Sequence, residues 1–207
     1  MREFLIGMDG EAYPFVQSFI SYDLYLMREE ILLYYVIQVA SGMEDKVEEQ
    51  IEVMVEQGIY QQCFHPIRHV KKKIRGEWKE LREKLLPGYV FIVSDDIEEL
   101  YLRLRYVPAF TKLLGKDGGQ FVPLPEHEVE WLKKISGSAD SRMEAEISRV
   151  YVSEEDVVTI LSGPLKDMEG YIKKIDLHRR IALVEVDFMN QKTVIHLGIE
   201  MVRKREG

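Results

Sequence analysis

Hydrophobic and polar residues change their spacing several times between residues 33 and 136. The apolar run at 33–39 predicts a strand that ends at the turn signal Ser41-Gly42. From Glu44, apolar residues recur every three or four positions, which predicts a helix that stops near Gly58. Residues 59–70 and 89–93 are rich in strand-forming side chains, and helices are predicted after Asp96 and Pro125. This alternation predicts a mixed α/β section.

The pattern changes after residue 136. Residues 137–152 have no firm apolar period and are interpreted as a linker. Short β-prone runs then occur between turns, at 157–161, 171–175, 181–186, 193–197 and 199–202. Five short strands in about fifty residues predict a small barrel. The predicted organisation is an N-terminal extension (1–32), an α/β domain (33–136), a linker (137–152) and a barrel domain (153–207), and the fold class is α+β.

Composition narrows the classes of function. The chain has 207 residues and a formal net charge of −8, which argues against a surface that is basic throughout. Cys63 is the one cysteine, so an intrachain disulfide and a cysteine-rich metal site are excluded, and we interpret it as a small apolar residue. No signal peptide is recognisable, and no apolar run reaches the roughly 18 residues of a membrane span. We therefore expect a cytoplasmic protein that does not enter a membrane.

No arrangement of residues suggests catalysis. The glycines between 115 and 119 lack the Lys-Ser/Thr signature of a phosphate-binding loop. The histidines do not group with carboxylates at ligand spacing, and Pro66 prevents a helix that would align His65 with His69. We expect neither an enzyme nor a metal site nor a cofactor.

Two basic runs stand out in this acidic chain. The first extends from Arg68 to Lys84, with Gly76 at the tip of the excursion. Its candidate contacts with nucleic acid are Arg68, Lys71, Lys72, Lys73 and Arg75. It is interpreted either as a solvated hairpin or as a contact with DNA or with a protein partner, because phosphate contacts need only positive charge within reach.

The second basic run lies on a predicted strand pair and its turn. Its members, with one lysine on the preceding loop, are Lys166, Lys173, Lys174, His178, Arg179 and Arg180. It is interpreted either as an ordinary charged turn or as a hairpin tip that binds RNA, since arginine pairs bidentately with guanine edges and phosphates.

Several motifs resemble those of one protein family. Residues 158–176, with Gly163-Pro164 and then Gly170, resemble the KOW motif, in which Gly170 is expected to permit a sharp bend without a Cβ. The strand at 34–38 with its acidic helix, the Leu-Pro-Gly-Tyr-Val-Phe segment at 86–91, Val107-Pro108 and Leu114-Gly115 resemble the N-terminal domain of the NusG family of bacterial transcription factors. The resemblance covers about residues 33–135 and 150–204, in the family's order.

This resemblance implies an adaptor with a NusG-type α/β sandwich and an SH3-like KOW barrel. It implies contact with the clamp helices of the largest RNA polymerase subunit through an apolar patch, for which the candidates are Tyr35, Tyr89, Phe91, Phe110 and Leu113. The alternative is that these side chains simply form the core. We expect a monomer.

Within the family, the chain is similar to the specialised LoaP antiterminators, which recognise an RNA hairpin in the nascent leader. Leu165 and Met168 stand where general members carry aromatic residues, and the turn at 188–190 also differs. Those loops carry the family's contacts with termination factor Rho or a ribosomal protein, so the leader RNA hairpin is the favoured partner. A general elongation factor that binds Rho or a ribosomal protein, and a KOW protein of the translation apparatus, remain as alternatives. Residues 1–26 have no counterpart in the family pattern and are interpreted as a non-native extension or a regulatory tail.

Overall fold

A computed structural model describes residues 4–6, 12–14, 32–110, 112–117, 120–136 and 143–202. Contacts divide the chain into a unit of residues 1–32 and a unit of residues 33–207. In the first unit, β1 (Phe4–Ile6) pairs antiparallel with β2 (Ala12–Pro14). All that follows concerns the second unit.

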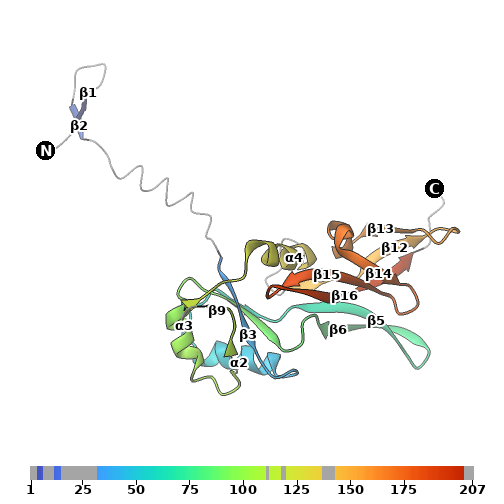
Figure 1. Ribbon diagram of the computed structural model, residues 1–207, viewed down its shortest axis with the longest axis horizontal. Coiled ribbons are helices and arrows are strands. Elements are labelled where there is room, and N and C mark those ends of the chain that lie inside the picture. The colour runs from blue at the N-terminus through green and yellow to red at the C-terminus, as the bar shows by residue number, and fades with distance from the viewer. Residues whose placement is uncertain are drawn as a thin grey trace. The chain divides into compact units, whose positions relative to one another are not determined.

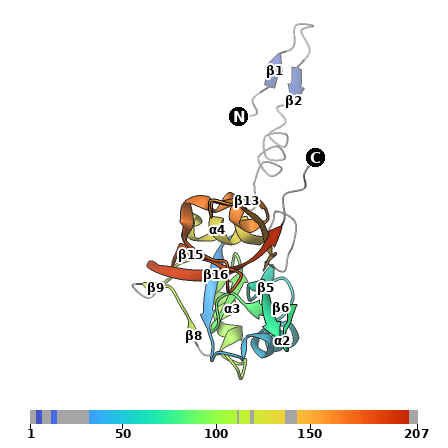
Figure 2. The ribbon, with the colours of Figure 1, turned by 90° about the vertical axis from the view of Figure 1, so that its right-hand side faces the viewer.

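A four-stranded antiparallel sheet organises the N-terminal part of this unit, in the order β4-β7-β3-β8. The strands are β3 (Tyr34–Gln38), β4 (Gln62–Phe64), β7 (Tyr89–Val93) and β8 (Lys112–Leu113). Helices α2 (Glu44–Met54) and α3 (Ile97–Leu104) cover one face (Figures 1 and 2). Ile37, Val90 and Ile92 point to these helices and are fully buried against Ile51 and Leu100. The predicted strand–helix alternation is confirmed here.

Glu44 ties the start of α2 to the loop before β7. This buried carboxylate accepts hydrogen bonds from the Gly88 amide at 2.6 Å, the Gly42 amide at 2.8 Å and the Lys84 ammonium at 2.6 Å. Burial favours its protonated form, but the bonds from Lys84 and Gly88 lower the pKa of Glu44. Gly88 has a φ of 92°, a conformation that favours glycine. The bond to Glu44 and the positive φ account for the glycine at position 88.

A long hairpin leaves this part of the fold. Its strands β5 (Ile67–Ile74) and β6 (Glu77–Lys84) are joined by Arg75 and Gly76, which have φ values of 51° and 89°. Two central residues with positive φ are typical of a tight type I′ hairpin turn. The segment β11 (Glu144–Ala145) pairs with β5 in parallel. The remaining elements are β9 (Lys116–Asp117), β10 (Gln120–Phe121) and helix α4 (Glu126–Ser136).

The C-terminal barrel is a five-stranded sheet in the order β13-β12-β16-β15-β14. Its elements are β12 (Ser148–Val152), β13 (Val158–Ser162), the short helices η1 (Pro164–Asp167) and η2 (Glu169–Tyr171), β14 (Ile172–Asp176), β15 (Ile181–Phe188) and β16 (Gln191–Val202). Alternate residues of β15 are buried, from Ala182 to Phe188, as expected for a strand with one face on a core. The α+β class is confirmed, and the C-terminal part is consistent with an SH3-like KOW barrel. None of the helices in the described segments has the length and apolar character that crossing a bilayer requires.

Two local predictions need correction. The runs predicted at 193–197 and 199–202 are one strand, because β16 continues through Gly198. Glycine is needed there since a Cβ would overlap the carbonyl oxygen of His69 on β5. The segment predicted as linker contains β12, which is paired with β13 and β16. The division of the chain into domains itself stays a prediction.

Gly170 does not have the expected conformation. Its φ is not positive, and a Cβ there would meet no atom within 4 Å. The bend lies earlier, at Gly163, whose φ is 91° and whose Cβ would lie 2.7 Å from the Ser148 Cα. Gly163 is therefore the sterically required glycine of this motif.

Truncation of the core between sheet and helices tests this packing. We expect Ile92→Ala to lower the free energy of unfolding by about 2–5 kcal/mol, because it leaves a cavity among buried side chains. Urea denaturation measures the change. Leu102→Ala is the control, since Leu102 is half exposed on α3, and it is expected to change stability by less than about 0.5 kcal/mol. Equal effects would contradict the described core.

Candidate partner-binding surfaces

The sheet face opposite α2 and α3 is aromatic. The rings of Phe64 and Phe91 stack with centroids 5.5 Å apart, and Tyr34 meets Phe64 edge-on at 6.4 Å. These residues share a face because Val36 pairs with Phe91, and Phe91 with Phe64, across neighbouring strands. An aromatic sheet face needs a cover, and helix α4 supplies part of it, with the Lys133 ammonium 5.9 Å from the centre of the Tyr34 ring.

The rest of the cover comes from the barrel. Phe188, at the end of β15, lies edge-on to Tyr89 at 5.1 Å and tilted against Phe91 at 5.8 Å. Trp131 of α4 meets the same ring at 6.5 Å. Phe188 is buried by these contacts. The tip of the β15–β16 hairpin therefore occupies the aromatic face.

A buried carboxylate holds this hairpin tip. Glu128, in the first turn of α4, accepts hydrogen bonds from the amides of Met189 at 2.8 Å and Asn190 at 3.0 Å. These turn residues have φ values of 53° and 59°, typical of a type I′ turn, so both amides point outward to the same carboxylate. The Trp131 indole N–H also donates to the Asp187 carbonyl at 2.9 Å. The charge of Glu128 is thus compensated by oriented amides.

The five residues predicted to bind polymerase do not form one surface. Tyr35 and Leu113 are buried in the core beneath the helices, and Phe110 packs beside them against Tyr101 at 6.5 Å. Tyr89 and Phe91 lie on the opposite face, under Phe188. The polymerase-binding role of these residues stays a prediction.

The structure brings members of the two basic runs together. Arg68 of β5 donates to the His196 carbonyl of β16 at 3.0 Å, and the Arg180 guanidinium lies 3.9 Å from the centre of the Trp78 ring on β6. A cavity of about 760 Å³ lies between the hairpin β5–β6 and the barrel. Its basic lining residues are Arg68, Lys71, Lys72, Lys73, His178, Arg179 and His196. Arg75, Lys166, Lys173 and Lys174 do not line it, and Lys173 pairs with Glu185 at 2.9 Å.

His69 lies in a cluster that sequence spacing did not reveal. Its Nδ1 is 2.9 Å from Glu80, and its Nε2 is 2.9 Å from Glu144 and 3.9 Å from Glu146. Burial disfavours the charged imidazole, but the hydrogen bonds to Glu144 and Glu80 raise the pKa of His69. Donor atoms of His69, Glu144 and Glu146 are close enough to hold an ion, yet Glu144 already pairs with His69 and Arg82. These ion pairs fasten β11 to the hairpin β5–β6.

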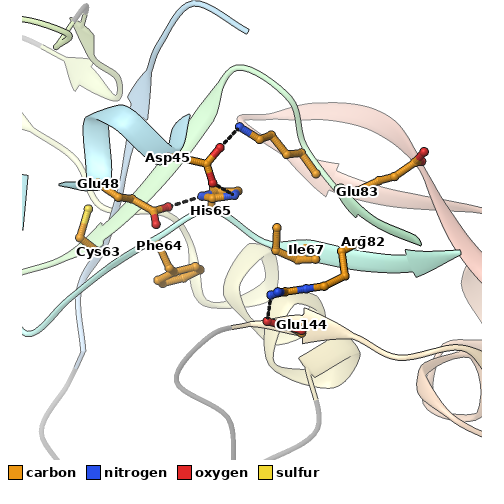
Figure 3. A pocket seen from close by; sticks show the side chains of 10 residues that line it. Asp45, Glu48, Cys63, Phe64, His65, Ile67, Arg82, Glu83 and Glu144 are labelled. Carbon is orange, nitrogen blue, oxygen red and sulfur yellow. Dashed lines mark hydrogen bonds and ion pairs between the residues drawn. The ribbon is translucent and has the colours of Figure 1, made fainter. Parts of the chain in front are cut away.

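A second cavity, of about 440 Å³, lies beside His65 and is shown in Figure 3. His65 is bonded to Glu48 and lies 3.5 Å from Asp45, which accepts a bond from Lys84 at 2.7 Å. Arg82 is paired with Glu144 at the other end (Figure 3). The charges in this cavity are thus already matched with one another. It offers little attraction to a charged ligand.

Cys63 borders the same cavity. Burial, and then the nearby carboxylates of Glu48 and Glu52, raise the pKa of its thiol. The thiol stays protonated at neutral pH, and a protonated thiol is a poor nucleophile. This agrees with the interpretation of Cys63 as a packing residue.

Residues 32–133 match the sequence model of the family described as "Transcription termination factor nusG". The transcription termination/antitermination protein NusG of Thermus thermophilus is 29% identical over 181 residues, which cover 83% of this chain and 97% of that protein. The NusG protein of Borreliella burgdorferi is 28% identical over 182 residues, with 83% and 97% coverage. A solved structure described as "Domain interaction in Thermotoga maritima NusG" covers 81% of this chain and 93% of that chain, with 24% identity and a TM-score of 0.46.

In sequence, this chain is therefore similar to the NusG proteins of transcription termination and antitermination. The matches extend over both the sheet with its helices and the barrel, since more than four-fifths of the chain is aligned with each relative.

Replacement of the buried carboxylate tests how the hairpin tip is held. We expect Glu128→Gln to reduce the free energy that holds the hairpin tip against α4 by about 1–3 kcal/mol. An amide side chain offers the two N–H groups one acceptor fewer and no charge. Amide hydrogen exchange at Met189 and Asn190 measures the loss of protection. Glu130→Gln, at an exposed position on the same helix, is expected to leave that protection unchanged. Unchanged exchange in Glu128→Gln would contradict the role of this carboxylate.

The His69 cluster predicts a dependence of stability on pH. Folding raises the pKa of His69. The contribution of His69 to the free energy of unfolding is therefore complete below its ordinary pKa of 6.5, and it is lost as the pH rises through the pKa in the folded state. The hydrogen bond from His69 also lowers the pKa of Glu144. The stability that comes from the ionised Glu144 carboxylate is lost only as the pH falls through this lowered pKa. We expect the stability difference between the wild type and His69→Gln to shrink from pH 6 to pH 9, measured by urea denaturation. His127→Gln, at an exposed site on α4, is the control. A difference that grows with pH would contradict the assignment.

Proposed function

We propose that this chain is a NusG-type transcription antitermination and elongation factor. In this proposal, its sheet-and-helix part binds the clamp helices of the largest RNA polymerase subunit, and its barrel binds a leader RNA hairpin. The observation that carries the proposal is the sequence match to NusG termination/antitermination proteins across both parts of the chain. These relatives are transcription factors, which agrees with the expectation that the chain is not an enzyme.

The aromatic sheet face supports the polymerase part of the proposal. Tyr89 and Phe91 both pack against Phe188 of the barrel, and Trp131 of helix α4 contacts the same Phe188 ring. A cover that comes from a separate part of the fold can be withdrawn without unfolding the sheet. Polymerase would then compete with Phe188 for this face, and its apparent affinity would include the free energy of opening.

The convergence of basic residues supports the RNA part. His178 and Arg179 are exposed on the β14–β15 turn, where the Arg179 amide donates to Asp176 at 2.8 Å and fixes the turn. Leu165 and Met168, which replace the aromatic residues of general family members, are fully buried in this structure. Side chains in that position offer no surface to a protein partner.

The second candidate is a general elongation factor that binds Rho or a ribosomal protein through the barrel. It is favoured by the names of the relatives, which include termination as well as antitermination. The two candidates differ in whether activity depends on the transcribed leader.

A reconstituted transcription assay distinguishes the two. The purified chain is added to RNA polymerase on templates with an intrinsic terminator, with and without the leader of the operon that contains its gene. We expect readthrough to rise only on the template with that leader. Stimulation of Rho-dependent termination, with no dependence on the leader, would instead support the general factor. No effect on polymerase in either assay would contradict the proposed function altogether.

A further inference from the structure

The cavity between the hairpin β5–β6 and the barrel has two basic walls. One wall is formed by β5, with Lys72 and Lys73 exposed. The other is formed by the β14–β15 turn, with His178 and Arg179 exposed. We call this cavity the basic groove. Residues about one hundred positions apart in the sequence thus line one surface, and Figure 1 shows the hairpin running alongside β16 of the barrel.

Contacts at the base of the basic groove set the distance between its walls. The Arg180 guanidinium stacks on Trp78, and Arg68 bonds to the His196 carbonyl. Lys71 pairs with Glu200 of β16, which leaves this lysine turned toward the barrel. Gly198 allows β16 to pass directly against the His69 backbone. These contacts use some of the cations to join the two parts and leave others for a ligand.

The charged side chains of the basic groove that are not used in contacts between its walls are positive. Among the described residues, Lys73 and Arg179 form no ion pair. The one carboxylate that lines the groove, Glu83, is already paired with Arg68 at 3.0 Å and with Lys72. Burial is the main cause that lowers the pKa of His196, and the nearby charges of Arg68 and Arg179 lower it further. A concentration of positive charge in a chain of net charge −8 is suited to an anion.

We propose that the basic groove binds the phosphate backbone of an RNA helix across both walls, so that RNA contacts the hairpin β5–β6 and the barrel together. Cations on two separate walls match a ligand with repeated negative charges better than a small anion, which one wall could bind alone. This inference rests on the proposed RNA-binding function and deepens it. Such contacts position RNA and do not read its sequence.

The test measures binding of the full-length chain to a fluorescein-labelled RNA stem-loop of fixed sequence by fluorescence anisotropy, at salt concentrations from about 50 to 200 mM. Lys73→Ala removes one charge from the hairpin wall, and Arg179→Ala removes one from the barrel wall. We expect each variant to weaken binding about five- to tenfold near 0.1 M salt. We also expect the slope of log affinity against log salt to fall by about one, as for the loss of one phosphate contact. The double variant Lys46→Ala/Lys112→Ala, which removes exposed lysines outside the groove, is expected to bind as the wild type does.

Trp78→Ala tests the geometry without a change of charge. It removes the ring on which Arg180 stacks, and we expect binding to weaken although every lysine and arginine remains. Circular dichroism and an unchanged urea midpoint for the sheet core establish that each variant is folded.

The outcomes separate this inference from the proposed function. If Arg179→Ala weakens binding while Lys73→Ala and Trp78→Ala do not, RNA binds the barrel alone, and the shared groove is wrong although the proposed function stands. Equal affinity for a DNA stem-loop of the same sequence would overturn the assignment to RNA in favour of nucleic-acid backbone in general. No binding of the wild type to either probe would overturn the groove as a nucleic-acid site.

Discussion

The packing of the barrel against the sheet depends on one contact, between Glu128 of α4 and the tip of the β15–β16 hairpin. A buried carboxylate, Glu128, receives two backbone N–H groups from the tip of the β15–β16 hairpin and so places Phe188 on the aromatic face of the sheet. An unpaired buried carboxylate would be costly, and an uncovered aromatic face would be exposed to water. The same hairpin tip supplies hydrogen bonds to the carboxylate and covers the aromatic face. The packing of the barrel against the sheet follows from this double requirement.

A second consequence concerns the surface between the barrel and the hairpin β5–β6. Once β16 lies against β5, the two basic runs of the chain face each other across one groove. Neither run is unusual alone, since a charged hairpin and a charged turn are ordinary surface features. The unusual feature is that both basic runs line the same groove. In this account the packing that places Phe188 on the face proposed for polymerase also assembles the surface proposed for RNA.

The sequence predicts the elements well and their assembly poorly. Strand β7 and helix α3 are marked by local spacing and turn residues, and they are found where expected. The residues of β16 predict two strands separated at Gly198, because the reason for that glycine is a contact with His69, more than a hundred residues away. The family resemblance places Tyr35 and Tyr89 in one apolar patch, although strand pairing sends them to opposite faces of the sheet. Glu128 is one of several glutamates in its helix, and its buried position depends on the barrel, so no local signal identifies it.

The central claim is that Phe188, at the tip of the β15–β16 hairpin, covers the sheet face proposed to bind polymerase and must leave it when polymerase binds. The most direct test is the affinity of the full-length chain for a fragment containing the clamp helices of the largest polymerase subunit, measured for the wild type, Phe188→Ala and Glu128→Gln. Removal of about 1.4 kcal/mol of closing free energy should tighten binding by about tenfold in each variant. Affinity that is unchanged or weaker in both folded variants would contradict the account.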